Sequence, residues 1–327
     1  MTYLFLILGL ATLIIGGEFL VSGAVGIAKK FQISTLVIGM TVISFGTSAP
    51  ELLVSIQAAL SGVPEIAIGN VIGSNIANIA LVLGITVIIF PIVIDKNSKI
   101  IDWPMMMLSS ILFYVFFLFF GDGYVIERWE GIVLFVLLLS FIYYLISSSR
   151  KKSKKLAKES ITEVEIEPVK NIWKSLGLLV LGLVGLYFGA AWLLESAVIL
   201  AGVFGMSNEV IGLTIVAFGT SVPELVTSAV AAFKKETDIS IGNLIGSNIF
   251  NIMAVIGITA IVKPIPVGWE TNSNMIWMLA IAFALLPLML IGKKLGRLKG
   301  VMLFGTYVVY ITLVVIASQN GSDLISQ

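Results

Sequence analysis

One long segment of the sequence occurs twice, and this repeat constrains the fold more than any other feature. Residues 38–92 align without a gap to residues 211–265, at an offset of 173 residues, and 31 of the 55 paired positions are identical. Within them, IGMTVISFGTSAPELLVS returns as IGLTIVAFGTSVPELVTS, and IAIGNVIGSNIANI returns as ISIGNLIGSNIFNI. The chain is therefore built from two copies of one structural unit.

Apolar stretches long enough to span a bilayer fill most of the chain. Charged residues make up 12% of it and hydrophobic residues 58%, whereas soluble domains carry roughly a quarter charged residues. Continuous apolar runs of this length are typical of membrane-spanning helices, since a barrel strand would alternate polar and apolar residues over about ten positions. The sequence predicts an all-α polytopic membrane protein. Ten transmembrane helices are expected, at about residues 3–28, 33–60, 66–92, 103–120, 130–148, 173–201, 206–233, 239–262, 275–292 and 299–317.

These helices divide into two five-helix units, residues 1–148 and 173–327, joined by a cytoplasmic linker at 149–172. Because five is an odd number, the second unit enters the membrane from the side opposite to the first. The two units are therefore expected to be inverted repeats. Inverted repeats are typical of secondary transporters, which place the substrate site between the repeats near the middle of the bilayer.

The basic residues predict the orientation. If the N-terminus is outside the cell, 18 of the 20 Lys and Arg residues fall on the cytoplasmic side, and only Arg128 and Lys263 fall outside. This distribution follows the positive-inside rule. Both termini are accordingly expected outside, in the cell membrane, with the basic part of the linker close to anionic lipid headgroups.

Two glutamates lie in the middle of expected spans. Glu51 and Glu224 occupy equivalent positions of the repeat, and an ionised carboxylate at the bilayer centre costs at least ~2.5 kcal/mol, so such residues are functional by default. A protonated glutamate that only makes hydrogen bonds inside the bundle is the structural alternative. Two copies with the same polar neighbours are hard to explain in that way.

Oxygen-bearing side chains accompany each glutamate. Thr47, Ser48 and Glu51 are spaced to share one face of a helix, and Pro50 is expected to kink that helix and free a carbonyl group. The second copy repeats the pattern with Thr220, Ser221, Pro223 and Glu224. Hydroxyl, carbonyl and carboxylate oxygens together suit Na⁺ or Ca²⁺.

The following helix of each copy adds a second layer of oxygens. It contains a serine and an asparagine one turn apart, namely Ser74 and Asn78, and Ser247 and Asn251. It also contains a small-residue face that lets helices approach closely, formed by Gly69 and Gly73, and by Gly242 and Gly246. We expect these faces to pack against the proline-containing helices.

The composition restricts the kind of ion. The chain has no His and no Cys, so a bound divalent cation must be a hard one held by oxygen. The two carboxylates carry two negative charges, which one divalent cation neutralises, and several Na⁺ ions could use the same oxygens instead. Glu18 and Glu195 also lie within spans; they either line an ion passage or make polar contacts.

The paired GTSxPE and GNxIGSNIxNI segments resemble the α-repeats of the Na⁺/Ca²⁺ exchangers, in the compact prokaryotic form of the calcium/cation antiporter superfamily. The resemblance covers nearly the whole chain. It implies that the second, third, seventh and eighth helices enclose a diamond-shaped cluster of ion sites, across which the long first and sixth helices slide. It implies a central divalent site made by the carboxylates of Glu51 and Glu224 and the carbonyls of Thr47 and Thr220. It further implies flanking Na⁺ sites formed by Ser48, Ser221, Ser74, Ser247 and the carbonyls of Ser44 and Ala217. Asn78 and Asn251 would complete the middle of the cluster.

Two details bear on the counter-ion. Some relatives have Asp where this chain has Asn251, and the absence of that third acid argues against co-transport of K⁺. The proton-coupled branch typically has Asn, rather than Thr-Ser, before its acidic residue. The GTSxPE motif therefore favours Na⁺.

The expected function is a secondary antiporter that exchanges Na⁺ for Ca²⁺ by alternating access, electrogenic with the three Na⁺ per Ca²⁺ that the resemblance suggests. An H⁺/Ca²⁺ antiporter of the same fold and a passive cation channel are the alternatives. An enzyme is not expected, because the chain has no His, no Cys and no HExxH-type motif. We expect no cofactor besides the transported ions, no nucleic acid and no obligatory protein partner.

Overall fold

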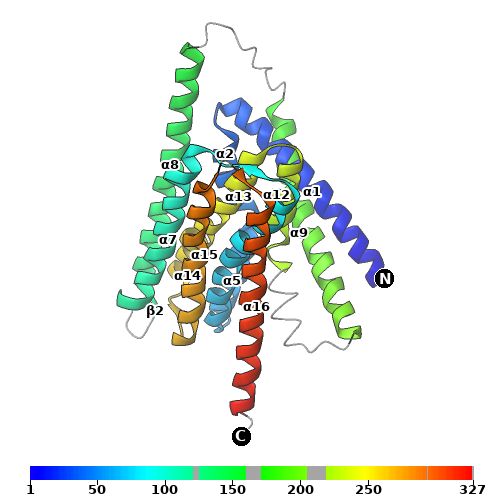
Figure 1. Ribbon diagram of the computed structural model, residues 1–327, viewed down its shortest axis with the longest axis vertical. Helices are drawn as coiled ribbons and strands as arrows, with labels where there is room; N and C mark the ends of the chain where they lie inside the picture. The colour runs from blue at the N-terminus through cyan, green and yellow to red at the C-terminus, as the bar shows by residue number, and fades with distance from the viewer. Residues whose placement is uncertain (121–124, 160–170, 205–218, 293, 326–327) are drawn as a thin grey trace.

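The computed structural model describes residues 1–120, 125–159, 171–204, 219–292 and 294–325, and these residues are almost entirely helical (Figure 1). The helices of the first half are α1 Thr2–Phe31, α2 Thr35–Ile38, η1 Gly39–Ile43, α3 Ser44–Thr47, α4 Ala49–Leu60, α5 Pro64–Ile76, η2 Ala77–Leu83, α6 Gly84–Ile89, η3 Ser98–Asp102, α7 Trp103–Val115, η4 Phe116–Phe120 and α8 Arg128–Glu159. Those of the second half are α9 Ile172–Val203, α12 Val222–Phe233, α13 Thr237–Phe250, η6 Asn251–Ile256, α14 Gly257–Val262, η7 Trp269–Thr271, α15 Asn272–Leu290 and α16 Arg297–Ile325.

Eight helices among the described residues are long and apolar enough to cross a membrane, and a ninth is added if the bent pair Thr35–Thr47 and Ala49–Leu60 is one span. The chain is thus a multi-pass integral membrane protein. The expected seventh span, 206–233, falls partly on residues 205–218, which lie outside the described residues, so that α12 is its described part. The number of ten spans stays a prediction.

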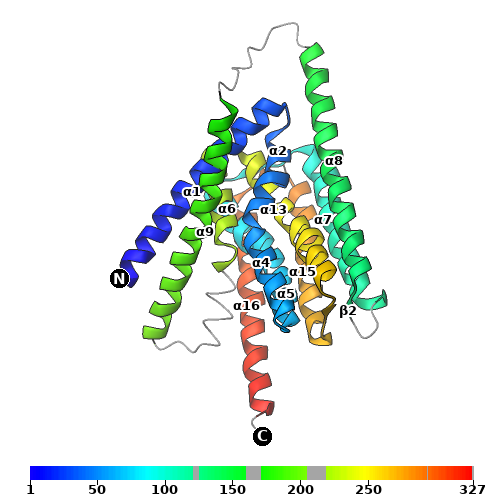
Figure 2. The same ribbon diagram turned by 180° about the vertical axis from the view of Figure 1, so that it is seen from behind.

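Two of these spans form the centre of the bundle. Each span has an 18-residue window of high hydropathy, and the share of that window buried inside the protein differs between spans. It is 78% in Pro64–Ile89 and 83% in Thr237–Val262, but only 22% in Ile172–Val203. The two opposite views in Figures 1 and 2 both show α13 in the interior of the bundle. The repeated GNxIGSNIxNI segment thus supplies the two helices that are surrounded by protein on most sides.

The helices α1 and α9 form a pair at one side of the bundle (Figures 1 and 2). They run antiparallel, with Gly9 beside Leu193 and Gly23 beside Leu179. A Cβ atom at Gly9, Gly16 or Gly23 would lie only 2.8, 2.8 or 2.6 Å from a backbone nitrogen of α9. Glycine is therefore required where the two backbones touch.

Two short antiparallel ladders are the exceptions to the helical structure of the described chain. The strand β1, Ile92–Val93, pairs with β4, Lys294–Leu295, and β2, Val125–Ile126, pairs with β3, Ile265–Pro266. Each ladder joins a segment of the first half to a segment of the second half, and β1 and β3 occupy equivalent positions of the repeat. The all-α prediction is confirmed apart from these two-residue ladders.

Candidate functional site

Both proline motifs follow a break in the helix at a serine. Ser48, between α3 and α4, has φ −87° and ψ 2°, and Ser221, before α12, has φ −88° and ψ 2°. Pro50 and Pro223 then lie in the first turn of the new helix, where a backbone N–H has no helical acceptor and a proline is well tolerated. The two copies of the motif therefore have the same local backbone structure.

The break at Ser48 confirms one expectation and contradicts another. The bend at the proline motif is confirmed, since the helical segments Thr35–Thr47 and Ala49–Leu60 meet at 42°. The expectation that Thr47, Ser48 and Glu51 share one face of a single helix is wrong, because α3 ends at Thr47 and α4 begins at Ala49. Glu51 instead lies in the first turn of α4. There the positive end of the helix dipole favours its negative charge.

The two glutamates are buried, and their carboxyl groups have no hydrogen-bond partner among the described residues. Glu51 is 0% exposed and Glu224 is 1% exposed, and neither oxygen of either carboxyl group makes a hydrogen bond with any described residue. The carboxyl group of Glu224 lies within electrostatic range of Glu51 and near the hydroxyls of Thr47 and Ser48, although neither hydroxyl forms a hydrogen bond with it. Buried charges without partners are costly. A cation between the two groups would remove that cost.

Two asparagine side chains are likewise buried without a hydrogen-bond partner among the described residues. Asn78 and Asn251 are 1% and 0% exposed, and both amide atoms of each have no hydrogen-bond partner in the described part of the chain. Each lies in a wide π-helical segment, η2 or η6, at equivalent positions of the repeat; such segments occur frequently at functional sites. Because α4 packs against η6 and α12 against η2, each glutamate helix of one half contacts the asparagine segment of the other half.

Thr47 connects the two halves directly. Its hydroxyl lies 3.2 Å from Oδ1 of Asn243 and 3.4 Å from the hydroxyl of Ser247. One turn earlier, the hydroxyl of Ser44 lies 3.0 Å from the carbonyl oxygen of Asn243. The carbonyl oxygen of Ser44 accepts the N–H of Ser48 at 2.9 Å and also lies 3.4 Å from the hydroxyl of Thr47.

The small-residue face of α13 is packed as predicted. A Cβ atom on Gly246 would lie 2.7 Å from Cα and 2.8 Å from the carbonyl oxygen of Met40, and it would also strike the hydroxyl of Ser44. Gly242 approaches Leu36 equally closely, with a Cβ position 2.6 Å from the carbonyl oxygen. The absence of side chains therefore allows α13 to lie against α2, η1 and α3.

Most of the predicted site residues are buried. Ten of the twelve predicted residues are at most 3% exposed: Ser44, Thr47, Ser48, Glu51, Ser74, Asn78, Ser221, Glu224, Ser247 and Asn251. Thr220 is half-buried. Ala217 lies outside the described residues, and so does the segment that the repeat would place against Gly69 and Gly73.

A second pair of asparagines was missed by the sequence analysis. Nδ2 of Asn70 donates to the backbone oxygen of Glu51 at 3.3 Å and to the hydroxyl of Ser55 at 3.2 Å. In the other half, Nδ2 of Asn243 donates to the hydroxyl of Ser228 at 3.1 Å. Both asparagines and both serines are identical in the two copies of the repeat, which is the signal that could have identified them. They attach the glutamate helices to α5 and α13.

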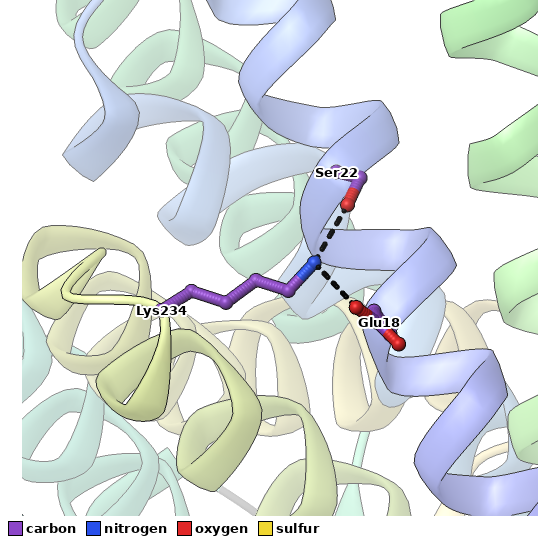
Figure 3. A network of polar contacts seen from close by, with 3 residues as sticks. All are labelled: Glu18, Ser22 and Lys234. Carbon is purple, nitrogen blue, oxygen red and sulfur yellow. Dashed lines mark hydrogen bonds and ion pairs between the residues drawn. The ribbon is translucent and has the colours of Figure 1, made fainter.

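The other two membrane glutamates lie on the α1–α9 pair. Oε1 of Glu18 lies 3.1 Å from Nζ of Lys234, which also donates to the hydroxyl of Ser22 at 2.9 Å (Figure 3). Glu195 is exposed on α9. For Glu18, the structure favours a polar contact over a place in an ion passage.

The donor set determines what the site can bind. No group of three His, Cys, Asp or Glu side chains that could hold a metal ion occurs among the described residues. A cation between Glu51 and Glu224 would therefore be completed by hydroxyl, amide and carbonyl oxygens. This set suits hard cations such as Na⁺ and Ca²⁺.

Comparisons with known proteins agree with this donor set. The sequence profile of the sodium/calcium exchanger protein family matches residues 1–147 and 174–316. The putative antiporter CaxA of Alkalimonas amylolytica is 37% identical over 314 residues, which cover 94% of this chain and 96% of that protein. The sodium/calcium exchanger MaX1 of Methanosarcina acetivorans is 31% identical over 347 residues, which cover 95% and 97%.

The solved structures include a similar fold. A structure of the sodium-calcium exchanger NCX_Mj, soaked with 10 mM Na⁺ and no Ca²⁺, superposes with a TM-score of 0.81 at 33% sequence identity. The match covers 95% of this chain and 98% of that chain. The similarity thus extends over both halves of the bundle and is not confined to the repeated motifs.

Proposed function

The chain belongs to the sodium/calcium exchanger protein family, and on this basis we propose that it exchanges Na⁺ for Ca²⁺ across the cell membrane by alternating access. The observation that carries the proposal is the pair Glu51 and Glu224, which are both buried and have no hydrogen-bond partner among the described residues, with the hydroxyls of Thr47 and Ser48 near Glu224. The family consists of membrane transporters, so the site serves to move ions and not to catalyse a reaction.

The charge of the site supports Ca²⁺ as one cargo. Glu51 and Glu224 supply two negative charges, which one Ca²⁺ neutralises. Three Na⁺ would leave the same site with one positive charge. Moving one net charge per cycle changes the free energy by about 2.3 kcal/mol per 100 mV of membrane potential, so the exchange would be electrogenic.

Each predicted ligand has a role in the proposal. The central Ca²⁺ site would use the carboxylates of Glu51 and Glu224 with the carbonyls of Thr47 and Thr220. Ser48, Ser221, Asn78 and Asn251 are buried, and their side-chain polar atoms have no hydrogen-bond partner among the described residues, which supports their use as ligands. The flanking Na⁺ sites and the middle of the cluster would use Ser48, Ser221, Ser74, Ser247, Asn78, Asn251 and the carbonyls of Ser44 and Ala217.

We also propose that residues 1–148 and 173–327 are inverted repeats joined by the linker 149–172. Three equivalences support this arrangement. Ser48 and Ser221 break their helices with nearly the same backbone angles, η2 and η6 end at the equivalent positions Leu83 and Ile256, and β1 and β3 each pair with a strand of the opposite half.

Alternating access would be produced by the α1–α9 pair. Glycines of both helices lie at the contact between α1 and α9. Helix α1 also packs against α12 and α2, which belong to the part of the bundle that holds the proposed ion sites. A pair that packs tightly within itself can move as one body. Its displacement would open the ion cluster first to one side of the membrane and then to the other.

The test is ⁴⁵Ca²⁺ uptake into sealed proteoliposomes loaded with Na⁺, with K⁺ or with an outward proton gradient. Uptake that requires internal Na⁺ and increases with an inside-positive potential, set by K⁺ and valinomycin, is the expected result. Uptake driven by the proton gradient alone would indicate the H⁺/Ca²⁺ antiporter. Ca²⁺ entry without any counter-ion would indicate a channel. Na⁺-driven uptake that is independent of voltage would indicate two Na⁺ per Ca²⁺ and exclude the charge balance proposed above.

The site is tested by Glu51→Gln and Glu224→Gln, each of which should abolish Ca²⁺ uptake because a neutral amide removes half of the site charge. The protein should remain folded, because each substitution removes a buried charge that has no hydrogen-bond partner among the described residues. Glu65→Gln, at an exposed position in the first turn of α5, is the matched control and should transport normally. Normal uptake by either site variant would exclude that carboxylate as a ligand.

The orientation is tested with single cysteines, because the chain contains none. A cysteine at Ser61, in the exposed turn after α4, should react with an impermeant maleimide in intact cells. A cysteine at Ser153 should be protected. The opposite labelling pattern would reverse the proposed orientation.

A further inference from the structure

A pocket lined by several acidic residues, none of them a predicted ion ligand, lies where the first turn of α2, the segment after β1, the C-terminal part of α8 and the start of α13 meet. It has a volume of about 280 Å³. Polar residues from all four elements line it, among them Ser34, Asp95, Asp102, Lys152 and Asp238. Ser34, Asp95, Asp102 and Lys152 lie outside the repeated segments 38–92 and 211–265, and Asp238 precedes the GNxIGSNIxNI motif of the second copy.

The pocket carries more negative than positive charge. Asp95 lies within electrostatic range of both Asp102 and Asp238, and its carboxylate is therefore repelled by each of them. Among the described residues that line the pocket, Lys152 is the one basic side chain; it is exposed on α8 and lies within electrostatic range of Asp238. Neither Lys152 nor any other described lysine forms an ion pair with these three carboxylates. The negative charge is thus only partly balanced by the protein.

At Asp102, the negative charge of a buried carboxyl group is not fully balanced by the protein. It is 1% exposed, and its Oδ2 atom has no hydrogen-bond partner among the residues that the structure describes. Asp95, by contrast, is exposed and uses Oδ1 to accept the N–H of Asn97 at 2.7 Å. A buried carboxylate oxygen without a partner is costly, so a positively charged occupant at this position would stabilise the fold.

The geometry restricts how the occupant is held. The three carboxylates do not converge closely enough to bind one metal ion directly, because no such group of three acidic side chains occurs in the described chain. The pocket volume of about 280 Å³ can hold a cation with a shell of about six waters, since one water occupies about 30 Å³. Small divalent cations such as Mg²⁺ keep several waters when they bind to proteins.

We propose that this pocket binds a hydrated divalent cation, which Asp95, Asp102 and Asp238 hold through its water shell. The ion joins α8 and α13 to the start of α2, where the hydroxyl of Ser34 caps the helix by accepting the N–H of Val37 at 3.3 Å. The backbone N–H of Ser34 also donates to the hydroxyl of Ser149 at 2.8 Å. The cation therefore fixes the end of the span that continues to Glu51. Its binding does not depend on the proposed exchange reaction.

The test counts Mn²⁺ bound to the purified full-length protein, by the loss of the free Mn²⁺ signal in electron paramagnetic resonance. Mn²⁺ serves as a probe for a hydrated divalent ion. The Glu51→Gln, Glu224→Gln double variant removes the charges of the exchange site and should retain one bound Mn²⁺. Adding Asp102→Asn should weaken that binding at least about tenfold, equivalent to about 1.4 kcal/mol. Adding Glu65→Gln should not change it.

Two results would overturn the proposal: no bound Mn²⁺ in the double variant, or equal binding after Asp102→Asn in folded protein. If Asp102→Asn does not fold, Asp95→Asn provides the same comparison at an exposed position. Added to the double variant, Asp95→Asn should then weaken Mn²⁺ binding about tenfold as well, equivalent to about 1.4 kcal/mol, and equal binding would overturn the proposal. Because these measurements involve no transport, their failure is distinguishable from a failure of Na⁺-driven Ca²⁺ uptake.

Discussion

Adding one methyl group at Gly246 tests whether the close contact between the two halves of the chain builds the ion site. In Gly246→Ala, the new Cβ atom would lie 2.7 Å from Cα and 2.8 Å from the carbonyl oxygen of Met40. Both atoms belong to the backbone and cannot rotate away. Since ordinary contacts begin at 3.4 Å, α13 and η1 must separate by at least about 0.7 Å, the difference between 3.4 and 2.7 Å.

The separation has an effect on stability and a separate effect on the site. Overpacking a buried contact costs about 1–3 kcal/mol, and the higher helix propensity of alanine returns about 1 kcal/mol, so the net loss should be about 0–2 kcal/mol. In addition, the hydroxyl of Thr47 lies 3.2 Å from Oδ1 of Asn243 and 3.4 Å from the hydroxyl of Ser247. A shift of about 0.7 Å would lengthen both contacts beyond hydrogen-bonding distance. The Ca²⁺ concentration needed for half-maximal uptake should therefore increase about tenfold or more.

The assay combines Ca²⁺-dependent uptake into Na⁺-loaded proteoliposomes with thermal unfolding in detergent. Gly177→Ala is the matched control, because Gly177 is also helical but exposed, and its Cβ position meets no atom of the described residues within 4 Å. The control should transport normally and should be unchanged in stability or up to about 1 kcal/mol more stable. If Gly246→Ala matches wild type in both uptake and stability, the contact is not needed to build the site.

Three further substitutions test single contacts. Lys234→Gln removes the ion pair between α12 and α1, whose side chains are 30% and 56% exposed; it should lower the free energy of unfolding by at most about 1 kcal/mol. The loss should disappear in high salt, and a loss that persists there would contradict an electrostatic contact. Lys263→Met removes the donor that lies 2.8 Å from the carbonyl oxygen of Ala59 at the end of α4, and it should destabilise by about 1.5–3 kcal/mol in thermal unfolding; an unchanged melting temperature would show that water replaces the lysine. Asn70→Ala removes the donor to the first turn of α4 and should weaken Ca²⁺ binding, measured by isothermal titration, by about 1 kcal/mol. Unchanged affinity would mean that the helix position does not depend on this bond.

Much of the site was predictable because the repeat shows which polar residues occur twice. Glu51 and Glu224 were identified as a pair in this way, and the structure buries both. Asn70 and Asn243 were equally visible as identical positions, but their role as donors to the glutamate helices depends on which helices pack together. The repeat identifies equivalent residues and does not specify their partners.

Other features depend on backbone structure or on contacts between distant segments. The sequence around Asn251 has the spacing of an ordinary helix, whereas the structure places Asn251 in the wide turn of η6. Pro50 suggested a kink inside one helix, yet the break lies two residues earlier, at Ser48. Likewise, Asp95, Asp102 and Asp238 form one pocket only because the fold brings together segments that are distant in the sequence.

The arrangement of charges links ion binding to the contact between the two halves of the chain. Glu51 comes from the first half and Glu224 from the second, and both carboxyl groups are buried within electrostatic range of each other. Their repulsion therefore opposes the packing of α4 and α12 around the cluster, whereas a bound cation favours it. A ligand that binds only the packed state stabilises that state by about 2.7 kcal/mol at a concentration of 100 times its Kd. Because Ca²⁺ and Na⁺ would each supply this stabilisation through the same two carboxylates, the loaded site would be packed and the empty site would be under repulsion. Such a difference between loaded and empty states is what coupled exchange requires.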